Sequence, residues 1–546
     1  MSPRNAKSQW DEVALLTLGA SASVALMAVS GVVLDNPGEV LLLDLVRPTV
    51  AALGLAIILP AVLFAAGMRT VALAVPVFLF AFFKFSGFMG AAEFAGLYGI
   101  NGFYAALAGF GLLTVVATDS IRRREQATIA KGTFCISVAI ATGSMIAVAM
   151  TLSQSSPPGQ AATDKILAEA PSPAFKRAGL PDIIYIVPDR YGSAATLKKH
   201  FNHDNEPFFA ELEKRGFFVD RDARSNYAKT VSSLSSSLNM ADLSALNAAM
   251  GAEETNRYPL YRLIREQSAQ RILRGAGYDY HHLGNWWGPS RRSPYADAQY
   301  IGSDTFWSKA TEFEKAVMRL TPIAPIATDG AAAERAECPR LHNQLDYIAE
   351  ARAKSDKPIF LFSHLTIPHD PITMDADGNC IEHVYYPGQG TKFSDYQKAY
   401  AGYVTYLNKR LLDMFDRLKA SDEKRGLIFV VQADEGPYPK RLQEDGGMVM
   451  QDFTDDEIRE KFGIINAIYW DAEIYGAPYL TETPINNWRI ILSKISGDEI
   501  PLIEDERSYL MRSDSLVYDN LDVTHVLATQ PRRLHASADS RDAQQH

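Results

Sequence analysis

Five apolar stretches near the N-terminus constrain this chain more than any other feature of its sequence. They lie near residues 13–34, 45–66, 71–90, 100–118 and 132–153. Each approaches or exceeds the ~20 residues that a helix needs to cross a bilayer. Buried helices of a soluble protein would not occur five in succession with so few charges, and the first stretch lacks the cleavage site of a signal peptide. The sequence therefore predicts a five-helix transmembrane domain over residues 1–153.

The basic residues between these stretches predict how the chain is oriented. Those on one side of the membrane are Arg4, Lys7, Arg69, Arg122, Arg123, Arg124 and Lys131, whereas the alternate loops carry mainly acidic residues. Because basic loops stay in the cytoplasm, the chain after residue 153 is expected outside. We expect a multi-pass protein of a bacterial inner (plasma) membrane with a periplasmic or extracellular C-terminal domain. Lys84, within the third stretch, is expected to reach the headgroup layer, with a lipid phosphate as the alternative contact.

The remaining chain is expected to form one large exported domain. Ser, Pro and Gly after residue 153 indicate a linker over 154–180, followed by a catalytic domain over 181–530 and a polar, disordered tail over 531–546. The net charge of −10 argues against a nucleic-acid partner. Cys338 and Cys380 both fall in the exported part, where an oxidising environment favours a disulfide.

Three apolar runs in this domain stop abruptly at polar residues. They are "DIIYIVPDRYG" (182–192), "KPIFLFSHLTIPHDP" (357–371) and "GLIFVVQADEGPYP" (426–439). Helical patterns near 206–216, 340–354 and 395–420 alternate with them, which is typical of a three-layer α/β fold with a mostly parallel sheet. Ligands of such sheets bind beyond the carboxyl ends of the strands. The side chains expected at that edge are Asp189, His364, His369, Asp434 and Glu435.

This set of residues predicts a metal site. Clustered carboxylates repel one another unless a cation neutralises them, and Asp, Glu and His are ligands for Zn, Mn and Mg. A nucleophile is available in "SNYAKTVSSLSSSLNM" (225–240), where Thr230 stands at the expected start of a helix. A hydroxyl there meets the positive end of the helix dipole and can be activated by a metal ion. Ser232 and Ser233 are the alternative nucleophiles. If the segment has no catalytic role, it is explained as a Ser-rich loop or a helix of small residues that packs against the sheet.

The order of these motifs resembles the alkaline phosphatase–sulfatase superfamily. The closer likeness is to its membrane-anchored branch, the lipoteichoic acid synthases and phosphoethanolamine transferases, which join five membrane helices to an external alkaline-phosphatase-like domain. The resemblance implies that Asp189 binds metal and that Thr230 carries the transferred group; no Cys lies nearby for modified-cysteine sulfatase chemistry. Asp434 matches the Asp of an Asp-His-Gly motif, but Glu435 replaces its His. That replacement favours Mn, Mg or Ca over Zn, or a site that has lost catalysis.

Further residues are assigned by the same resemblance. His364 and His369 fall in a segment that contacts the substrate in relatives, so either is a candidate general acid. Lys229 is a candidate phosphate contact, and Asn285 and Trp286 in "HHLGNWWGP" (281–289) are candidates for an acceptor or headgroup pocket. Each of these residues also has a purely structural explanation. The two histidines would lie in a turn fixed by prolines, Lys229 would be an exposed surface lysine, and Asn285 and Trp286 would belong to a packed surface loop.

These assignments predict a membrane-bound, metal-dependent phosphoryl-group transferase that acts through a phospho-Thr230 intermediate. The expected donor is a membrane lipid, and the expected acceptor is an envelope lipid or glycan. A phosphate or sulfate ester hydrolase with the same site, or a catalytically inactive envelope protein, are the alternatives.

Overall fold

The chain folds into two compact units, seen here in a computed structural model. It describes residues 3–528 apart from 36–41, 98, 154–158, 177–178, 303–310, 324–329, 386–391, 422–424, 445–448 and 514. The first unit contains residues 1–157 and 304–333, and the second contains 158–303 and 334–546. The tail expected over 531–546 lies outside the described residues. Most of the linker expected over 154–180 is described and contains helix α7 (Gln160–Ala168).

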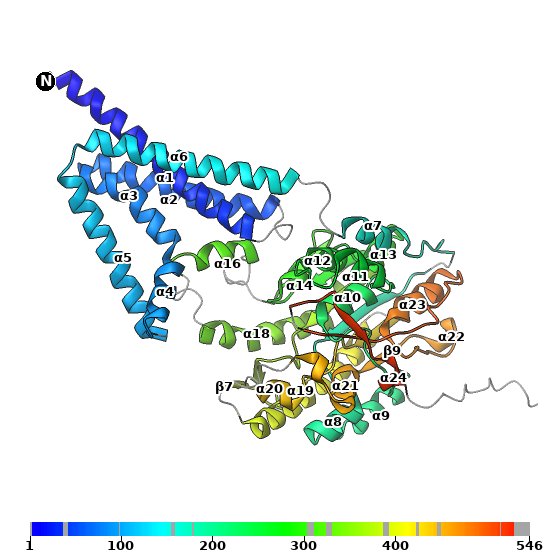
Figure 1. The fold of residues 1–546 in the computed structure, drawn as a ribbon. Coiled ribbons are helices and arrows are strands. Elements are labelled where there is room, and N and C mark those ends of the chain that lie inside the picture. Colours follow the sequence, from blue (N-terminus) through cyan, green and yellow to red (C-terminus); the bar gives the residue numbers. More distant parts are fainter. Residues whose placement is uncertain are drawn as a thin grey trace, which may run out of the picture. The chain divides into compact units, whose positions relative to one another are not determined.

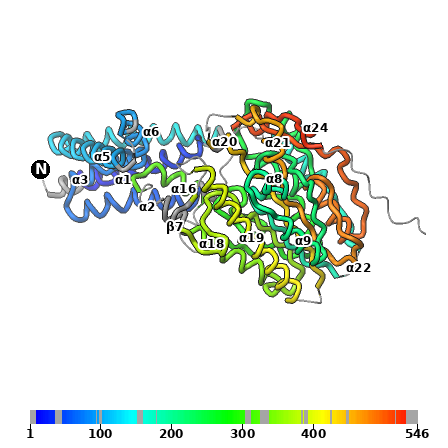
Figure 2. Tube along the Cα trace, turned by 90° about the horizontal axis from the view of Figure 1, so that it is seen from below, coloured from blue at the N-terminus to red at the C-terminus, as the bar shows by residue number. Residues whose placement is uncertain are grey.

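Apolar helices make up the first unit. They are α1 (Pro3–Asp35), α2 (Leu42–Ala65), α3 (Arg69–Phe83), α4 (Phe85–Phe94), α5 (Gly99–Arg122) and α6 (Gln126–Ser153). Helix α1 packs against α2, α3 and α6, and these helices run side by side in Figure 2. Within the described residues, four helices are long and apolar enough to cross a membrane, and α3 with α4 counts as a fifth span if the bent pair is one. The chain is therefore a multi-pass membrane protein, with four to five spans where the sequence predicted five.

The third predicted span is broken at a single residue. Lys84 separates α3 from α4, and the two helices meet at 56°. The backbone N–H of Phe85 donates to the Leu320 carbonyl, 3.0 Å away, in the segment that follows α16 (Glu312–Arg319). Arg47 on α2 also forms an ion pair with Glu314 on α16, with Nε 2.8 Å from Oε1. Residues 311–323, which the sequence placed in the catalytic domain, thus pack within the helical unit.

A seven-stranded sheet forms the centre of the second unit, within the part of the chain that is described. Its strand order is β2-β9-β8-β1-β5-β3-β4. The strands are β1 (Asp182–Pro188), β2 (Phe218–Asp220), β3 (Asp279–Leu283), β4 (Ala298–Tyr300), β5 (Ile359–Leu365), β8 (Leu427–Gln432) and β9 (Asn466–Tyr469). Strand β1 pairs in parallel with β5 and β8, whereas β9 runs antiparallel to β8. The predicted mostly parallel sheet is confirmed.

Helices cover both faces of this sheet and make three layers (Figure 1). One face packs on α8 (Ala194–Phe201), α9 (Glu206–Lys214), α18 (Gly330–Ala349) and α19 (Phe393–Ser421). The other packs on α10 (Thr230–Ser237), α11 (Ser244–Met250), α12 (Tyr258–Arg265), α13 (Ser268–Gly275) and α23 (Asn487–Ser496). Along β1, Ile184 and Ile186 enter the first core, and Ile183, Tyr185 and Val187 enter the second. This alternation explains why the strand reads as one continuous apolar run.

Smaller elements complete the unit. They are α14 (Gly288–Arg291), α20 (Lys440–Glu444), α21 (Asp455–Phe462), α22 (Ala472–Tyr475), α24 (Thr524–Leu527), and the two-stranded sheets β6 (Ile372–Met374) with β7 (Cys380–Tyr385) and β10 (Tyr509–Met511) with β11 (Asn520–Asp522). A disulfide joins Cys338 on α18 to Cys380 on β7, the pair expected from the sequence.

Candidate metal centre

The site lies where the three central strands end. Val187 on β1 pairs with His364 on β5, and Ile186 pairs with Val431 on β8. Parallel pairing carries the residues that follow, Asp189 and Asp434, to the same edge of the sheet as His364. The backbone N–H of Asp189 donates to the carbonyl of Leu365 on β5, which extends the pairing one step beyond β1.

Asp189, His364 and Asp434 converge on one buried point. The Nε2 atom of His364 is 3.2 Å from Asp189 Oδ2 and 4.0 Å from Asp434 Oδ2. One potential ligand atom from each residue lies within 4.8 Å of the other two. All three side chains are buried. The structure thus brings together two of the metal ligands expected from the sequence, and adds His364, which was expected to act as an acid.

The unsatisfied polar atoms of this cluster fit a divalent cation. Among the described residues, Asp189 Oδ1, Asp434 Oδ2 and His364 Nε2 are buried and accept or donate no well-aligned hydrogen bond. Buried polar atoms without partners are costly in an apolar interior. Two carboxylate oxygens and one imidazole nitrogen form a donor set that suits Mn or Zn.

Burial and neighbouring charges also shift the pKa values of the two carboxyl groups in the cluster. Burial, followed by the charges of Asp189 and Glu435, raises the pKa of Asp434. Burial also acts on Asp189, but the positive charges of His369, His364 and Arg190 outweigh it and lower the pKa of that carboxyl. Two carboxylates this close hold unequal affinities for protons, and a bound cation would relieve their repulsion.

His364 is held from behind by two buried polar side chains. Asn285 donates to the His364 carbonyl oxygen at 2.8 Å, and Ser290 donates to Asn285 Oδ1 at 3.1 Å. The lone pairs of Ser290 Oγ therefore face His364 Nδ1 at 3.0 Å. Asn285 Nδ2 also lies 3.1 Å from Nδ1, and its two N–H groups reach both that nitrogen and the carbonyl. When Nε2 coordinates a metal ion, Nδ1 carries the proton of the neutral imidazole, and Ser290 Oγ is placed to accept it.

Glu435, the other expected ligand, forms ion pairs with two cations. Its Oε1 atom is 3.0 Å from Lys461 Nζ and 3.3 Å from Arg190 Nε, while Oε2 has no partner among the described residues. Lys461 also donates to the carbonyl of Gly436 at 3.0 Å. Its ammonium is completely buried, and burial lowers its pKa to about 8 despite the attraction of Glu435. At least one carboxylate oxygen of Glu435 thus serves an ion pair.

Three cations surround the ring of Tyr438 beside the cluster. Lys461 Nζ, Arg190 Cζ and Lys229 Nζ lie 3.8, 4.2 and 4.6 Å from the ring centre. Arg190 is further fixed by Asp370, 2.8 Å from its NH1. Sequence reasoning found Lys229 but missed Lys461, Arg190 and Tyr438. Arg190 directly follows Asp189, so its place in the sequence could have indicated that it lies near the site. No neighbouring residue gave such an indication for Lys461.

Thr230 is the first residue of α10, as the sequence predicted. Its hydroxyl lies beside the Asp434 carboxylate and partly offsets the rise in the pKa of that carboxyl. Ser233, one of the alternatives, is buried and donates to the Asp434 backbone carbonyl at 2.6 Å. Ser232 is buried as well, so Thr230 is the more accessible of the three hydroxyls.

The remaining candidate residues lie around the same edge. His369 is half-buried, and its ring is 5.7 Å from that of Trp286, which is 41% exposed. Trp287 packs its ring 5.6 Å from that of His364. Asn285 is fully buried behind His364, which places it as a support for that ring.

Comparison with known proteins assigns the second unit to a family. The sulfatase family profile matches residues 181–480, which is more than half of the chain. The chain belongs to the sulfatase family. It is therefore a sulfatase-like transferase or hydrolase, in agreement with the superfamily that the motifs indicated. No curated protein matches this sulfatase-family chain.

Several solved structures are similar to it. The C-terminal periplasmic domain of EcEptC from Escherichia coli is 10% identical, with a TM-score of 0.42, and the match covers 65% of this chain and 97% of that one. The lipooligosaccharide phosphoethanolamine transferase A from Neisseria meningitidis, an integral membrane protein, is 14% identical over 89% of this chain and 95% of that one, with a TM-score of 0.39. The periplasmic domain of the phosphoethanolamine transferase EptC from Campylobacter jejuni is 12% identical over 57% and 89%, with a TM-score of 0.37.

Proposed function

We propose that this protein is a membrane-bound, metal-dependent phosphoryl-group transferase that works through a phospho-Thr230 intermediate. The observation that carries the proposal is the place of the Thr230 hydroxyl, at the start of α10 and beside the Asp434 carboxylate, next to buried ligand atoms that lack partners among the described residues. A hydroxyl at the start of a helix and next to a metal site is placed for nucleophilic attack.

Asp189, His364 and Asp434 would hold the metal ion, with Thr230 beside it. When bound, the ion supplies positive charge that neutralises the carboxylates and lowers the pKa of a nearby hydroxyl. We expect Mn or Zn, because the imidazole of His364 is a poorer ligand for Mg or Ca.

The protein's own side chains would carry the other steps. Thr230 Oγ1 attacks the phosphorus and gives up its proton towards the Asp434 carboxylate. Arg190, Lys229 and Lys461 place positive charge where phosphoryl oxygens become more negative. His369 is the candidate acid for the departing alcohol, because His364 would be a ligand of the metal ion. An acceptor hydroxyl then takes the group from phospho-Thr230.

The membrane helices support a membrane lipid as donor and an envelope lipid or glycan as acceptor. The basic loops support an inner-membrane location with the catalytic unit outside the cytoplasm. Asn285 supports His364 in this proposal, and Trp286, exposed beside His369, is the better candidate for contact with a headgroup.

The test is intact mass spectrometry of the full-length protein in detergent, loaded with Mn or Zn and incubated with membrane phospholipids. We expect a phosphorus-containing adduct on Thr230 that Thr230→Ala lacks and Thr230→Ser retains. Ser232→Ala is the matched control and should keep the adduct. Release of inorganic phosphate or sulfate without a modified acceptor would identify a hydrolase instead. Full complementation of a deletion strain by Thr230→Ala would refute the mechanism.

A further inference from the structure

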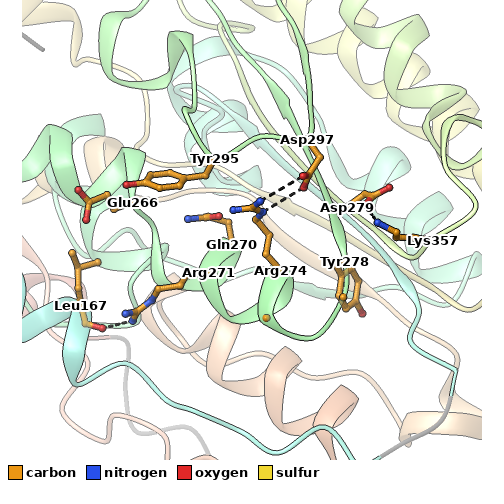
Figure 3. A pocket seen from close by; sticks show the side chains of 12 residues that line it. Leu167, Glu266, Gln270, Arg271, Arg274, Tyr278, Asp279, Tyr295, Asp297 and Lys357 are labelled. Carbon is orange, nitrogen blue, oxygen red and sulfur yellow. Dashed lines mark hydrogen bonds and ion pairs between the residues drawn. The ribbon is translucent and has the colours of Figure 1, made fainter. Parts of the chain in front are cut away.

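A cavity lies at the opposite edge of the sheet from the metal cluster. It has a volume of about 620 Å³ and is lined by α13, by the start of β3 at Asp279, and by Tyr295, Asp297 and Lys357 (Figure 3). The metal cluster follows the carboxyl ends of the strands, whereas this cavity lies where β3 begins. Its volume is within the ~300–1,000 Å³ typical of small-molecule sites.

A buried amide in the wall of this cavity lacks a partner. Gln270 is 3% exposed, and its Oε1 atom forms no hydrogen bond with any described residue. In Figure 3 its side chain lies between those of Tyr295 and Arg271. A buried acceptor without a hydrogen bond is unfavourable. The Gln270 oxygen in the cavity wall can therefore accept a hydrogen bond from a ligand.

The acids around the cavity are already paired with cations. Asp279 Oδ1 is 3.0 Å from Lys357 Nζ, and Asp297 Oδ2 is 3.3 Å from Arg274 Nε. The third acid, Glu266, is paired from outside the cavity by Arg262, 2.9 Å away. These pairs leave the charge of one further lining residue uncompensated.

That residue is Arg271. Among the described residues, its hydrogen-bond partner is the backbone carbonyl of Leu167 rather than a carboxylate. It is also exposed, so its remaining N–H groups are accessible. A guanidinium matches the shape of a carboxylate, with two parallel N–H donors. The cavity thus offers one guanidinium that has no carboxylate partner among the described residues, in a lining whose three acids and three cations otherwise balance.

An aromatic ring completes the lining. Tyr295 is 36% exposed and stands on the cavity wall with Gln270 and Arg271. A ring of this kind provides an apolar surface for the C–H face of a sugar, while paired acids and amides bond its hydroxyl groups. Polar groups that fix orientation around a small apolar surface are typical of specific ligand sites.

We propose that this cavity binds an acidic sugar of the uronate class, with its carboxylate on Arg271, its hydroxyls on Gln270 and Asp297, and its ring on Tyr295. Each uronate residue carries one negative charge, so a single residue of a chain in the cavity matches the single cation without a carboxylate partner among the described residues. A phosphomonoester carries about 1.5 to 2 negative charges and matches it less well. The site is separate from the metal cluster, so the proposal stands or falls independently of the proposed function.

Isothermal titration of the full-length protein in detergent tests this. The probes are trimers of galacturonate, glucuronate and mannuronate, with maltotriose as the neutral control and glycerol 3-phosphate as the phosphate control. We expect at least one uronate trimer to bind with a Kd below about 1 mM, and both controls to bind at least tenfold more weakly.

Variants locate the binding. Arg271→Gln should weaken the trimer at least tenfold, whereas Lys214→Gln, which removes an exposed charge from α9, and Thr230→Ala should leave its Kd unchanged. Equal thermal melts would show that Arg271→Gln is folded. The proposal is overturned if no uronate trimer binds, if maltotriose or glycerol 3-phosphate binds as tightly, or if Arg271→Gln binds like the wild type.

Discussion

The support of His364 by Ser290 makes a quantitative prediction about metal binding. Ser290 is fully buried, with Oγ 3.0 Å from His364 Nδ1 and 3.1 Å from Asn285 Oδ1. Ser290→Ala removes the oxygen that can accept a hydrogen bond from Nδ1–H when Nε2 binds metal, and so weakens the support of the metal-binding tautomer. Loss of such a support weakens metal binding by about 10- to 100-fold.

The structure favours the lower end of that range. Asn285 still holds the His364 backbone at 2.8 Å after the substitution, so the ring stays near its position. We therefore expect about a tenfold weaker Kd for Mn or Zn, which is about 1.4 kcal/mol. Competition with a chromophoric chelator, using full-length protein in detergent, measures this without relying on activity.

A matched control separates metal binding from folding. Ser508→Ala removes an equally buried hydroxyl, which donates to the Ser225 carbonyl at 2.8 Å, and should leave metal affinity unchanged. The thermal melt of metal-free Ser290→Ala shows whether the fold is intact. A folded Ser290→Ala protein with wild-type affinity would refute the support of His364 by Ser290.

Three further predictions follow from buried charges and the disulfide. Lys461→Met should destabilise the protein by about 3 kcal/mol, because it leaves Glu435 buried with Arg190 as its remaining ion-pair partner. A melting temperature equal to that of the wild type would contradict this. Adding Glu435→Gln to the variant should recover part of the lost stability. Burial and neighbouring carboxylates raise the pKa of Glu460 from 4.5 to about 8. Between these two values the folded protein keeps a proton that the unfolded chain loses, so the free energy of unfolding falls as the pH rises from 4.5 to about 8. Thermal melts of Glu460→Gln should therefore fall less between pH 6 and 8.5 than those of the wild type, and parallel curves would disprove it. Cys338→Ser should lower the free energy of unfolding by about 4 kcal/mol, because it removes a disulfide whose cysteines are 42 residues apart. A reductant should lower the melting temperature of the wild type but leave that of the variant unchanged.

Local patterns predicted the strand ends and the start of α10 correctly. An apolar run that stops at Asp189 or Asp434 has to leave the sheet there, because a buried strand cannot continue through a carboxylate without a partner. Thr230 begins α10 because the Ser-rich segment after it is small enough to pack against the sheet. These are properties of neighbouring residues, so they could be predicted without knowing the fold.

The role of Glu435 could not be predicted in this way. The sequence showed only that it stands beside Asp434, where a ligand is expected. Its charge is taken up by Lys461, which lies on α21 more than twenty residues later, and by Arg190 after β1. The imidazole then comes from His364 on a third strand. Which of several candidate side chains reaches the metal depends on distances between strands, and sequence order does not contain them.

The sequence by itself determined the apolar helices, the α/β pattern of the exported unit and the strand-end residues that converge at one edge, because hydrophobic periodicity and turn residues act over a few positions. Tertiary structure decided the break at Lys84, the packing of residues 311–323 with the apolar helices, and the partners of His364 and Glu435. Each of these depends on segments far apart in the chain. Their packing sets which charge is neutralised by which partner, and therefore which atoms remain for a metal ion.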